Sequence, residues 1–380
     1  MVEIKRVMTA SQRRAFASFP LKLYRDNEHY TPLFYRDEKA LLREKTNIYS
    51  DYTKSAFFLA YEGRKVVGRV GAIINYAHIE KTGEKRVRFT RLDAIDSFEV
   101  FEALMGAVRD FAFSEGITVV HGPLGYNDLD KEGLLVEGFE YDETYGGVYN
   151  EPYYLPHLEK LGFKKEFDWV ERLIEVGDKV DERYDRTADY IAKRFRFSEM
   201  VSDRMSTGEV ISRYADGIFR LIDEAYRKLH GTVPFTEKAK QAMISGLKLI
   251  LKPRYISCIA NEKGEMIAFG LMLPAIWHAL RKSKGKLFPI GIFYFLPLLF
   301  KKPTEMEMAL IGVADEYRNS GVHAMIIKRL WSNLIEDGIR EIESNANLED
   351  NLEINNMLGR FPQKMHKRRR CLIKEYGAVD

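Results

Sequence analysis

The segment that decides the fold is Glu307-Met-Ala-Leu-Ile-Gly-Val-Ala-Asp-Glu-Tyr-Arg-Asn-Ser-Gly-Val-His-Ala324. It begins as an apolar run typical of a strand and continues into a turn that contains Arg318 and Gly321. An amphipathic helix is predicted to begin at about Val322. A strand, a glycine-containing turn and a helix N-terminus together present backbone N–H groups beside the positive end of a helix dipole. We therefore predict an anion site here, suited to the pyrophosphate of a cofactor.

The composition of the whole chain is that of a globular protein. Its 380 residues favour two domains, and 46% hydrophobic with 30% charged residues is ordinary for this class. A net charge of +3 gives no reason to expect a nucleic-acid partner. The only cysteines, Cys258 and Cys371, provide no disulfide framework, and the N-terminus lacks the apolar core of a signal peptide. We expect a cytoplasmic protein.

One apolar segment, residues 287–300, lies between pairs of lysines. A membrane-spanning helix needs about 20 apolar residues, so this segment is too short and no transmembrane segment is predicted. Its prolines and glycine also interrupt a helix. We expect a buried or groove-lining insertion, and contact with a membrane interface is the alternative.

The two halves of the chain resemble each other weakly. Residues 58–72 and 257–271 both have the pattern of a hairpin, and the segments around Gly162 and Gly359 are also similar. Duplicated domains explain these similarities, and chance likeness between common hairpins is the alternative. We place an N-terminal domain at 1–178, a polar linker at 179–188 and a C-terminal domain at 189–380. The predicted fold class is α+β, an α/β sandwich whose sheets are mixed, mostly antiparallel and flanked by helices.

Residues Val313 to His323 resemble the acetyl-CoA signature of the GCN5-related N-acetyltransferase (GNAT) superfamily. Arg318, Gly321 and the Glu-Tyr that precedes them match, whereas Asp315 replaces a proline and His323 replaces a glycine or alanine. The first half resembles, through 133–139 and 150–154, a bacterial group of tandem GNAT-like proteins. The resemblance implies two GNAT-like domains.

The resemblance also implies acetyl-CoA as the acyl donor and assigns a role to each matched position. Arg318 would cap the phosphate site, although a solvated surface charge is an ordinary alternative. The alternative role of Gly321 is that of an ordinary turn glycine before a helix. The pantetheine arm would lie along Ile311, Gly312 and Val313, and backbone N–H groups of Asn319, Ser320, Gly321, Val322, His323 and Ala324 would hold the pyrophosphate.

The first half has no such loop. Its corresponding helix is preceded by Asp96 and begins with Glu99 close to its N-terminus, where negative charge would oppose a phosphate. We therefore predict that the N-terminal half is a degenerate copy that does not bind CoA.

Acetyl transfer to an amine needs a base and an acid. The superfamily often uses a strand glutamate as the base, and Glu307 is the candidate here. The usual acid is a tyrosine, but that position holds Asn355, which cannot donate a proton as an acid; Tyr376 is the substitute candidate. The histidines lack the spacing of metal ligands, so no metal is predicted. The basic run 364–370 is expected to be a solvated face, or else to contact an anionic ligand.

Three functions are consistent with these patterns. The first is an acyl-CoA-dependent N-acetyltransferase that acts on a small-molecule or peptide amine. The second is a non-catalytic GNAT-like binding protein, which the changes at Asn355 and His323 would explain. The third is a tandem acyl- or aminoacyl-transferase of the Fem-like kind, suggested by the duplication and the apolar insertion.

Overall fold

The computed structural model describes residues 1–227 and 231–377. The N-terminal half, which we define as the elements up to β7, begins with an edge strand and contains a hairpin and a strand–helix–strand unit. Its strands are β1 (Val2–Arg6), β2 (Thr53–Glu62), β3 (Lys65–Asn75), β4 (Arg86–Ala94), β5 (Val119–Gly122), β6 (Leu134–Glu137) and β7 (Lys164–Glu175). Its helices are α1 (Ala10–Ser18), α2 (Pro20–Leu23), α3 (Tyr35–Leu41), η1 (Glu44–Thr46), α4 (Tyr76–Thr82), α5 (Phe98–Ser114) and α6 (Tyr154–Lys160).

The C-terminal half, which we define as the elements from α7 onward, repeats this order with longer insertions. Its strands are β8 (Ser198–Glu199), β9 (Ile256–Ala260), β10 (Met266–Pro274), β11 (Met306–Val313), β12 (Glu341–Glu343), β13 (Asn347–Leu348) and β14 (Gln363–Glu375). Its helices are α7 (Glu182–Phe195), α8 (Thr207–Tyr226), α9 (Glu237–Leu247), η2 (Pro253–Tyr255), α10 (Trp277–Ser283), α11 (Ile292–Phe300), η3 (Asp315–Ser320), α12 (His323–Glu336) and α13 (Leu352–Leu358).

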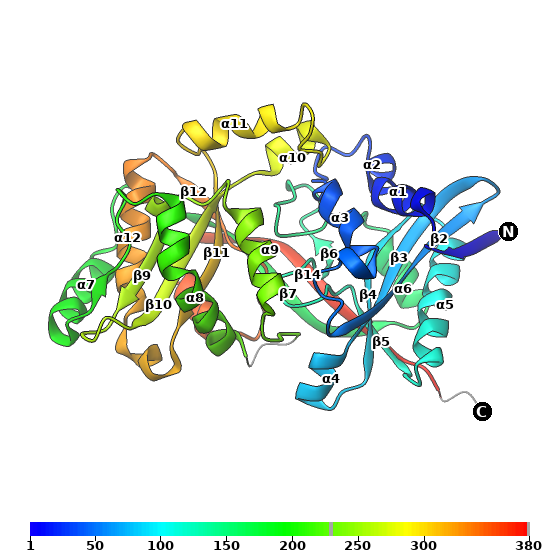
Figure 1. Cartoon of the computed structure of the whole chain (residues 1–380), viewed down its shortest axis with the longest axis horizontal. Coiled ribbons are helices and arrows are strands. Elements are labelled where there is room, and N and C mark those ends of the chain that lie inside the picture. The colour runs from blue at the N-terminus through cyan, green and yellow to red at the C-terminus, as the bar shows by residue number, and fades with distance from the viewer. Residues whose placement is uncertain (228–230, 378–380) are drawn as a thin grey trace.

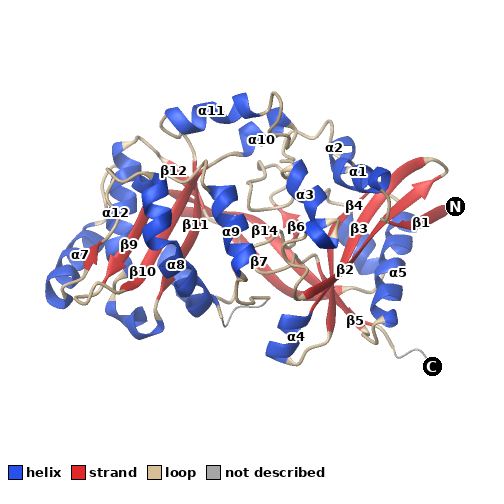
Figure 2. Cartoon of the chain, in the orientation of Figure 1, coloured by secondary structure: helices blue, strands red, loops and turns tan. Residues whose placement is uncertain are grey.

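The predicted hairpins are β2–β3 and β9–β10, and both are antiparallel. Helices flank the strands of both halves, which confirms the predicted α+β class (Figure 2). In the N-terminal half the long helix α5 follows β4, and in the C-terminal half α12 follows β11. The apolar side chains of each helix form the centre of a core. Burial of these apolar faces is the main force that holds helix to sheet.

The last strand of each half crosses into the other. Among the described residues the strands follow the order β1-β2-β3-β4-β5-β14-β7-β12-β11-β10-β9-β8, and β6 and β13 pair with β14 and β7. Thus β14 lies between β5 and β7, while β7 lies between β14 and β12. This exchange joins the halves into one continuous sheet (Figure 1). Helix α7 covers most of the segment predicted as a linker, and the domain boundary itself stays a prediction.

The basic run 364–370 is part of β14, and the expectation of a solvated face is wrong for its centre. The side chains of Lys367 and Arg369 are fully buried. Arg369 Nη2 donates to Glu143 Oε2 at 2.6 Å, and its Nε donates to Glu171. Burial alone would raise the pKa of Glu171, but Arg369 and Lys367 hold that pKa well below its usual range. The centre of the run is buried, and its charges are neutralised by acids from both halves, such as Glu171 and Glu343.

The apolar segment 287–300 also differs from the expectation of a buried insertion. It contains α11, which with α10 forms the connection from β10 to β11. Several of its large apolar side chains are exposed, and Phe300 is the most exposed at 83%. Among the described residues, the helices are all too short or too polar to cross a membrane.

Replacing Arg369 by methionine should destabilise the protein strongly. The change leaves Glu143 and Glu171 buried without their shared guanidinium, and breaking a buried pair in this way typically costs about 3–5 kcal/mol. Arg340→Met is the control, because the Arg340–Asp178 pair is exposed and should be worth no more than about 1 kcal/mol. Urea unfolding measures both. Equal effects would show that Arg369 does not secure the exchanged strand.

Candidate active site

The candidate site begins where β11 and β12 separate. β11 pairs with β10 along its length, but it pairs in parallel with β12 only at Met306–Ile342 and Glu307–Glu343. Beyond Glu307 the two strands diverge. The unpaired edge of β11 from Met308 onward therefore borders an opening between two neighbouring strands of the sheet.

A β-bulge re-aims β11 at the start of this opening. The register between β10 and β11 shifts between Leu271 and Met272, so Ala309 has no paired residue on β10. The side-chain amide of Asn345, from the connection after β12, donates to the carbonyl of Ala309 across the opening. Bulges are frequent beside active sites because they change the direction of backbone groups.

The turn after β11 places Gly321 where only glycine fits easily. Its φ is +80°, and a Cβ added there would lie 2.7 Å from Ile191 Cδ1 of α7. Ser320 Oγ accepts a hydrogen bond from the N–H of Val322 at 3.2 Å. The backbone conformation and the close packing of Ile191 therefore both favour glycine at position 321, in addition to the predicted contact with a phosphate.

The first turn of α12 holds the remaining predicted N–H donors. No described side chain caps this helix N-terminus. The N–H of Ala324 donates to the carbonyl of Gly321 at 2.9 Å and the N–H of Val322 donates to Ser320 Oγ, so the protein itself already uses these two predicted donors. The ring of His323 packs near Tyr184 at 6.3 Å, and burial lowers the pKa of His323. Contact of the remaining N–H groups with a phosphate stays a prediction.

Arg318 is half-buried and is held by protein groups. Its Nη2 donates to the carbonyl of Ala225 at 3.3 Å and lies 2.9 Å from Asp315 Oδ1. The other oxygen of Asp315 accepts from Arg227 at 2.5 Å. Asp315, which replaces the proline of the superfamily pattern, thus links the turn to the end of α8. Contact of Arg318 with a phosphate stays a prediction.

Tyr226, at the end of α8, occupies the edge of β11. Its hydroxyl donates to the carbonyl of Ile311 at 2.9 Å and is 3.4 Å from the N–H of the same residue. Burial raises the pKa of Tyr226 to about 12, so the phenol stays protonated. Ile311 belongs with Gly312 and Val313 to the stretch predicted to pair with pantetheine. A ligand bound there would displace the Tyr226 hydroxyl from Ile311. Sequence reasoning missed Tyr226, because α8 precedes β11 by a long insertion.

An apolar pocket lies between β10, β11 and the helices α12 and α13. It is lined by apolar side chains and the backbone of Gly270, and the indole N–H of Trp331 is a polar group among them. Its lining includes Met308, Ile311, Ile326, Trp331, Met357 and Phe361.

Glu307 is the titratable group at the closed end of the opening. Its Oε1 atom is buried and has no hydrogen-bond partner among the described residues. Burial and the neighbouring Glu343 together raise the pKa of Glu307 to about 8, although Lys131 and Lys367 oppose the shift. Burial also lowers the pKa of Lys131 to about 8. A carboxyl group with such a pKa is suited to accept a proton near neutral pH.

The neighbours of Glu307 come from both halves of the chain. Lys367 Nζ, on β14, lies 2.6 Å from Glu343 Oε1 and 3.5 Å from Glu171 Oε2. His366 Nε2 lies 2.8 Å from the same oxygen of Glu343. Glu143 lies within 4.0 Å of Lys367. The exchange of β7 and β14 brings these charges together, and sequence spacing gave no signal of it.

Two curated proteins are similar to this chain over most of its length. Protein YghO of Escherichia coli is 28% identical over 98% of this chain and 95% of its own length. A bacterial ceramide synthase of Caulobacter vibrioides is 27% identical over 83% of this chain and 81% of its own length. No family model matches the chain.

Among solved structures, a tandem GNAT protein from the clavulanic acid biosynthesis pathway aligns over all of both chains, with a TM-score of 0.56 and 13% identity. The chain has a tandem GNAT fold. A probable N-acyltransferase from Enterococcus faecalis aligns with a TM-score of 0.53 and 10% identity, over 99% of this chain and 73% of that one. Likeness at this identity establishes the fold and leaves the substrate open.

Within the tandem GNAT fold, Tyr376, the substitute candidate for the acid, lies apart from Glu307. Tyr376 follows β14 into the N-terminal half, where its ring packs on Phe113 at 5.9 Å and under the ammonium of Lys374. Asn355 donates to the carbonyl of Leu348 at 3.2 Å and so holds a turn. The structure does not bring Tyr376 together with Glu307, because the last strand pairs with the other half.

The N-terminal half contains the counterpart of the opening, and one main-chain hydrogen bond crosses it. β4 and β5 pair in parallel only over residues 86–88 and 119–121. Beyond them the N–H of Leu124 donates to the carbonyl of Phe89 at 2.9 Å. A pocket of about 40 Å³ remains beside this end of β4, and its lining includes the buried Arg69 and Asp93. That the N-terminal half does not bind CoA stays a prediction.

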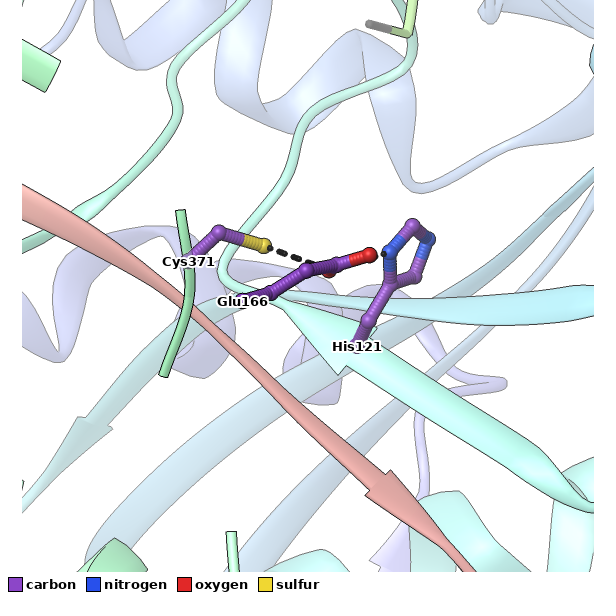
Figure 3. A group of neighbouring side chains, drawn as sticks. All are labelled: His121, Glu166 and Cys371. Atoms are coloured by element: carbon purple, nitrogen blue, oxygen red, sulfur yellow. Dashed lines mark hydrogen bonds and ion pairs between the residues drawn. The ribbon is translucent and has the colours of Figure 1, made fainter. Parts of the chain in front are cut away.

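A second polar cluster lies where β5, β7 and β14 meet (Figure 3). Glu166 Oε2 lies 3.1 Å from His121 Nδ1 and 3.3 Å from Cys371 Sγ. Its other oxygen accepts from Arg86. Burial alone would raise the pKa of Glu166, but His121 and Arg86 hold it at about 2. The cluster links strands of both halves.

Two groups among the described residues have ligand atoms close enough for a metal ion: this cluster, and Glu171 with Glu343 and His366. In both, a protein cation already pairs with the carboxylates, Arg86 in the first and Lys367 in the second. The prediction that the protein needs no metal stays a prediction.

Two glycine substitutions separate the conformational and packing roles of Gly321. Gly321→Ala places a Cβ against Ile191 at a positive φ, whereas Gly338→Ala has a similar φ of +77° but open space around it. We expect Gly338→Ala to cost about 1 kcal/mol and Gly321→Ala about 2–3 kcal/mol, because strain and overpacking add. Thermal or urea unfolding gives both values. Equal costs would mean that α7 does not press on the turn.

Proposed function

We propose that the protein is an acyl-CoA-dependent N-acyltransferase with Glu307 as the general base. The observation that carries the proposal is the buried Glu307 carboxyl, whose pKa burial raises to about 8, at the closed end of the opening between β11 and β12. The tandem GNAT fold supports it, since relatives in structure include a probable N-acyltransferase.

The acyl donor would lie along the open edge of β11. Backbone N–H groups of residues 319–324 that the protein does not itself use would hold the pyrophosphate, favoured by the dipole of α12. The pantetheine amides would pair with Ile311 and Val313 in place of the Tyr226 hydroxyl. Ile311 also borders the apolar pocket, whose volume of about 20 Å³ holds about one methyl-sized group until the site widens.

The reaction needs one proton acceptor for the amine. The Glu307 carboxylate takes a proton from the incoming ammonium, and the free amine nitrogen attacks the thioester carbonyl carbon. The C–N bond forms and the C–S bond breaks, and the second proton that the nitrogen loses passes through water to the departing CoA thiolate. Lys131 and Lys367 lie close enough to Glu307 to favour its carboxylate, and therefore to set the pH at which it works.

A long-chain lipid amine is the acceptor class that we propose. A relative of similar length is named a ceramide synthase, and a ceramide is the amide of a long-chain amino alcohol. The side chains that line the pocket beneath β11 are apolar, and they would contact an alkyl chain of either substrate once the pocket widens beyond its volume of about 20 Å³. Asn355, at the position of the usual acid, favours the alternative of a non-catalytic binding protein. Measurements of acyl transfer and of acyl-CoA binding distinguish the two functions.

Glu307→Gln should lower kcat/KM by about 100-fold or more, since a neutral amide cannot accept the proton. In the unchanged protein, kcat/KM should rise with pH through about 8, because the base must be ionised and burial raises the pKa of Glu307 to that value. Release of CoA thiol measures the rate. Glu305→Gln is the control: Glu305 lies on the same chain segment but is exposed and pairs with His278.

A pH profile that Glu307→Gln leaves unchanged would rule out Glu307 as the base. Binding of acyl-CoA by calorimetry with no transfer to any amine tested would favour the non-catalytic function.

Sphinganine should be a better acceptor than ethanolamine when each is offered with palmitoyl-CoA. Each buried methylene contributes about 0.8 kcal/mol, so a chain partly held in an apolar pocket should raise kcat/KM by more than about tenfold. Product amide is measured by mass spectrometry. Equal kcat/KM for the two amines would contradict a lipid acceptor while leaving acyl transfer itself intact.

A further inference from the structure

The connection between β10 and β11 carries a large exposed apolar surface. Phe300, Phe288, Ile290 and Phe293 are exposed by 83%, 73%, 66% and 64% of their surface. We call these four residues the aromatic cap. They belong to α11 and the turn before it, which lie along one edge of the molecule with α10 (Figure 1). Clustered exposure of large apolar side chains marks an interaction site in a folded protein.

The aromatic cap rests on a packed base and is not a loose loop. Phe295, on the inner side of α11, is buried and its ring lies 5.8 Å from that of Phe34. Ile276 and Leu280, at the start and in the middle of the α10 segment, belong to the same apolar cluster. α11 therefore buries one side and exposes the other, although both sides are apolar.

The base of the cap is fixed to both halves of the protein. Arg281 of α10 donates to the carbonyl of His29 at 2.6 Å and to Asp142 at 2.9 Å, both in the N-terminal half. The N–H of Tyr35 donates to the carbonyl of Gly285 at 2.9 Å. Bonds to the N-terminal half and chain continuity with β10 and β11 hold the cap in one orientation.

The charged residues within the segment that carries the cap are all basic. Residues 276–304 contain no aspartate or glutamate. Exposed lysines flank the apolar surface on both sides, and Lys302 pairs with Asp337 at 2.7 Å. The flanking lysines are Lys282, Lys284, Lys286, Lys301 and Lys302. An apolar surface with a cationic rim is complementary to a bilayer that presents anionic headgroups above acyl chains.

We propose that the aromatic cap docks the protein on the surface of an anionic lipid bilayer. Phe288, Ile290, Phe293 and Phe300 enter the boundary between headgroups and acyl chains, and the lysine rim pairs with lipid phosphates or other anionic headgroups. The proposal stands on exposure and charge alone and does not depend on the acyl-transfer chemistry.

Docking at this place would bring the candidate active site to the membrane. The N–H of Ala275 donates to the carbonyl of Glu305 at 3.0 Å, which closes the connection directly before β11. The strand that carries Glu307 therefore begins at the base of the cap. A lipid substrate could pass between the bilayer and the site over a short path.

Co-sedimentation with vesicles tests the docking. The probes are vesicles of equimolar phosphatidylcholine and phosphatidylglycerol, and vesicles of phosphatidylcholine alone. We expect binding to the anionic vesicles that weakens with added salt. Phe293→Glu with Phe300→Glu should lower the partition coefficient by about tenfold or more, because two charged groups would have to enter the interface.

Leu352→Glu is the matched control, since Leu352 is 70% exposed on α13 away from the cap. It should bind anionic vesicles as the unchanged protein does. The double variant should still release CoA with a short water-soluble amine when no vesicles are present, so a failure of docking is distinguishable from a failure of catalysis.

Three results would overturn the proposal. The first is the absence of binding to anionic vesicles, and the second is equal binding by the double variant. The third is a dimer in sedimentation velocity that the double variant abolishes while vesicle binding is unchanged, since the cap would then be the interface with a second copy of the chain.

Discussion

The pairing of Arg369 with Glu143 and Glu171 is the interaction on which the candidate site depends. It holds β14 beside β7 in the middle of the sheet, where both strands have crossed into the opposite half. A guanidinium without exposed surface needs such partners, because an unpaired buried charge is costly. The same contact fixes Glu143, in the loop after β6, beside Lys367. Charge neutralisation across the exchange therefore fixes the electrostatic surroundings of the proposed base.

The tandem GNAT fold was predictable from local patterns, but the exchange was not. The two hairpins and the segment 307–324 have short-range signals that do not depend on what lies beside them. A strand such as β14 has the same pattern whether it returns to its own half or enters the other. Its arginines suggested a solvated face because their partners are far away in sequence, as with Arg369 and Glu171, 198 residues apart.

The same distinction holds within the candidate site. Glu307 follows from its place before the glycine-containing turn, whereas its raised pKa depends on Glu343, Lys131 and Lys367, which only the folded sheet assembles. Tyr226 had no sequence signal, because its contact with Ile311 depends on how α8 lies on the sheet. Tyr376 was a reasonable candidate by distance along the chain, but β14 carries it away from the site.

The exchange of strands also constrains how the protein emerges from the ribosome. The N-terminal half is synthesised first, but β5 lies between β4 and β14, and β14 consists of residues 363–375. Until those residues leave the exit tunnel, β5 presents an open strand edge and the acids of β7 lack their cations. An unpaired edge of this kind invites association with other chains. Folding of the first half is thus completed by the end of the second, which favours chaperone protection during translation.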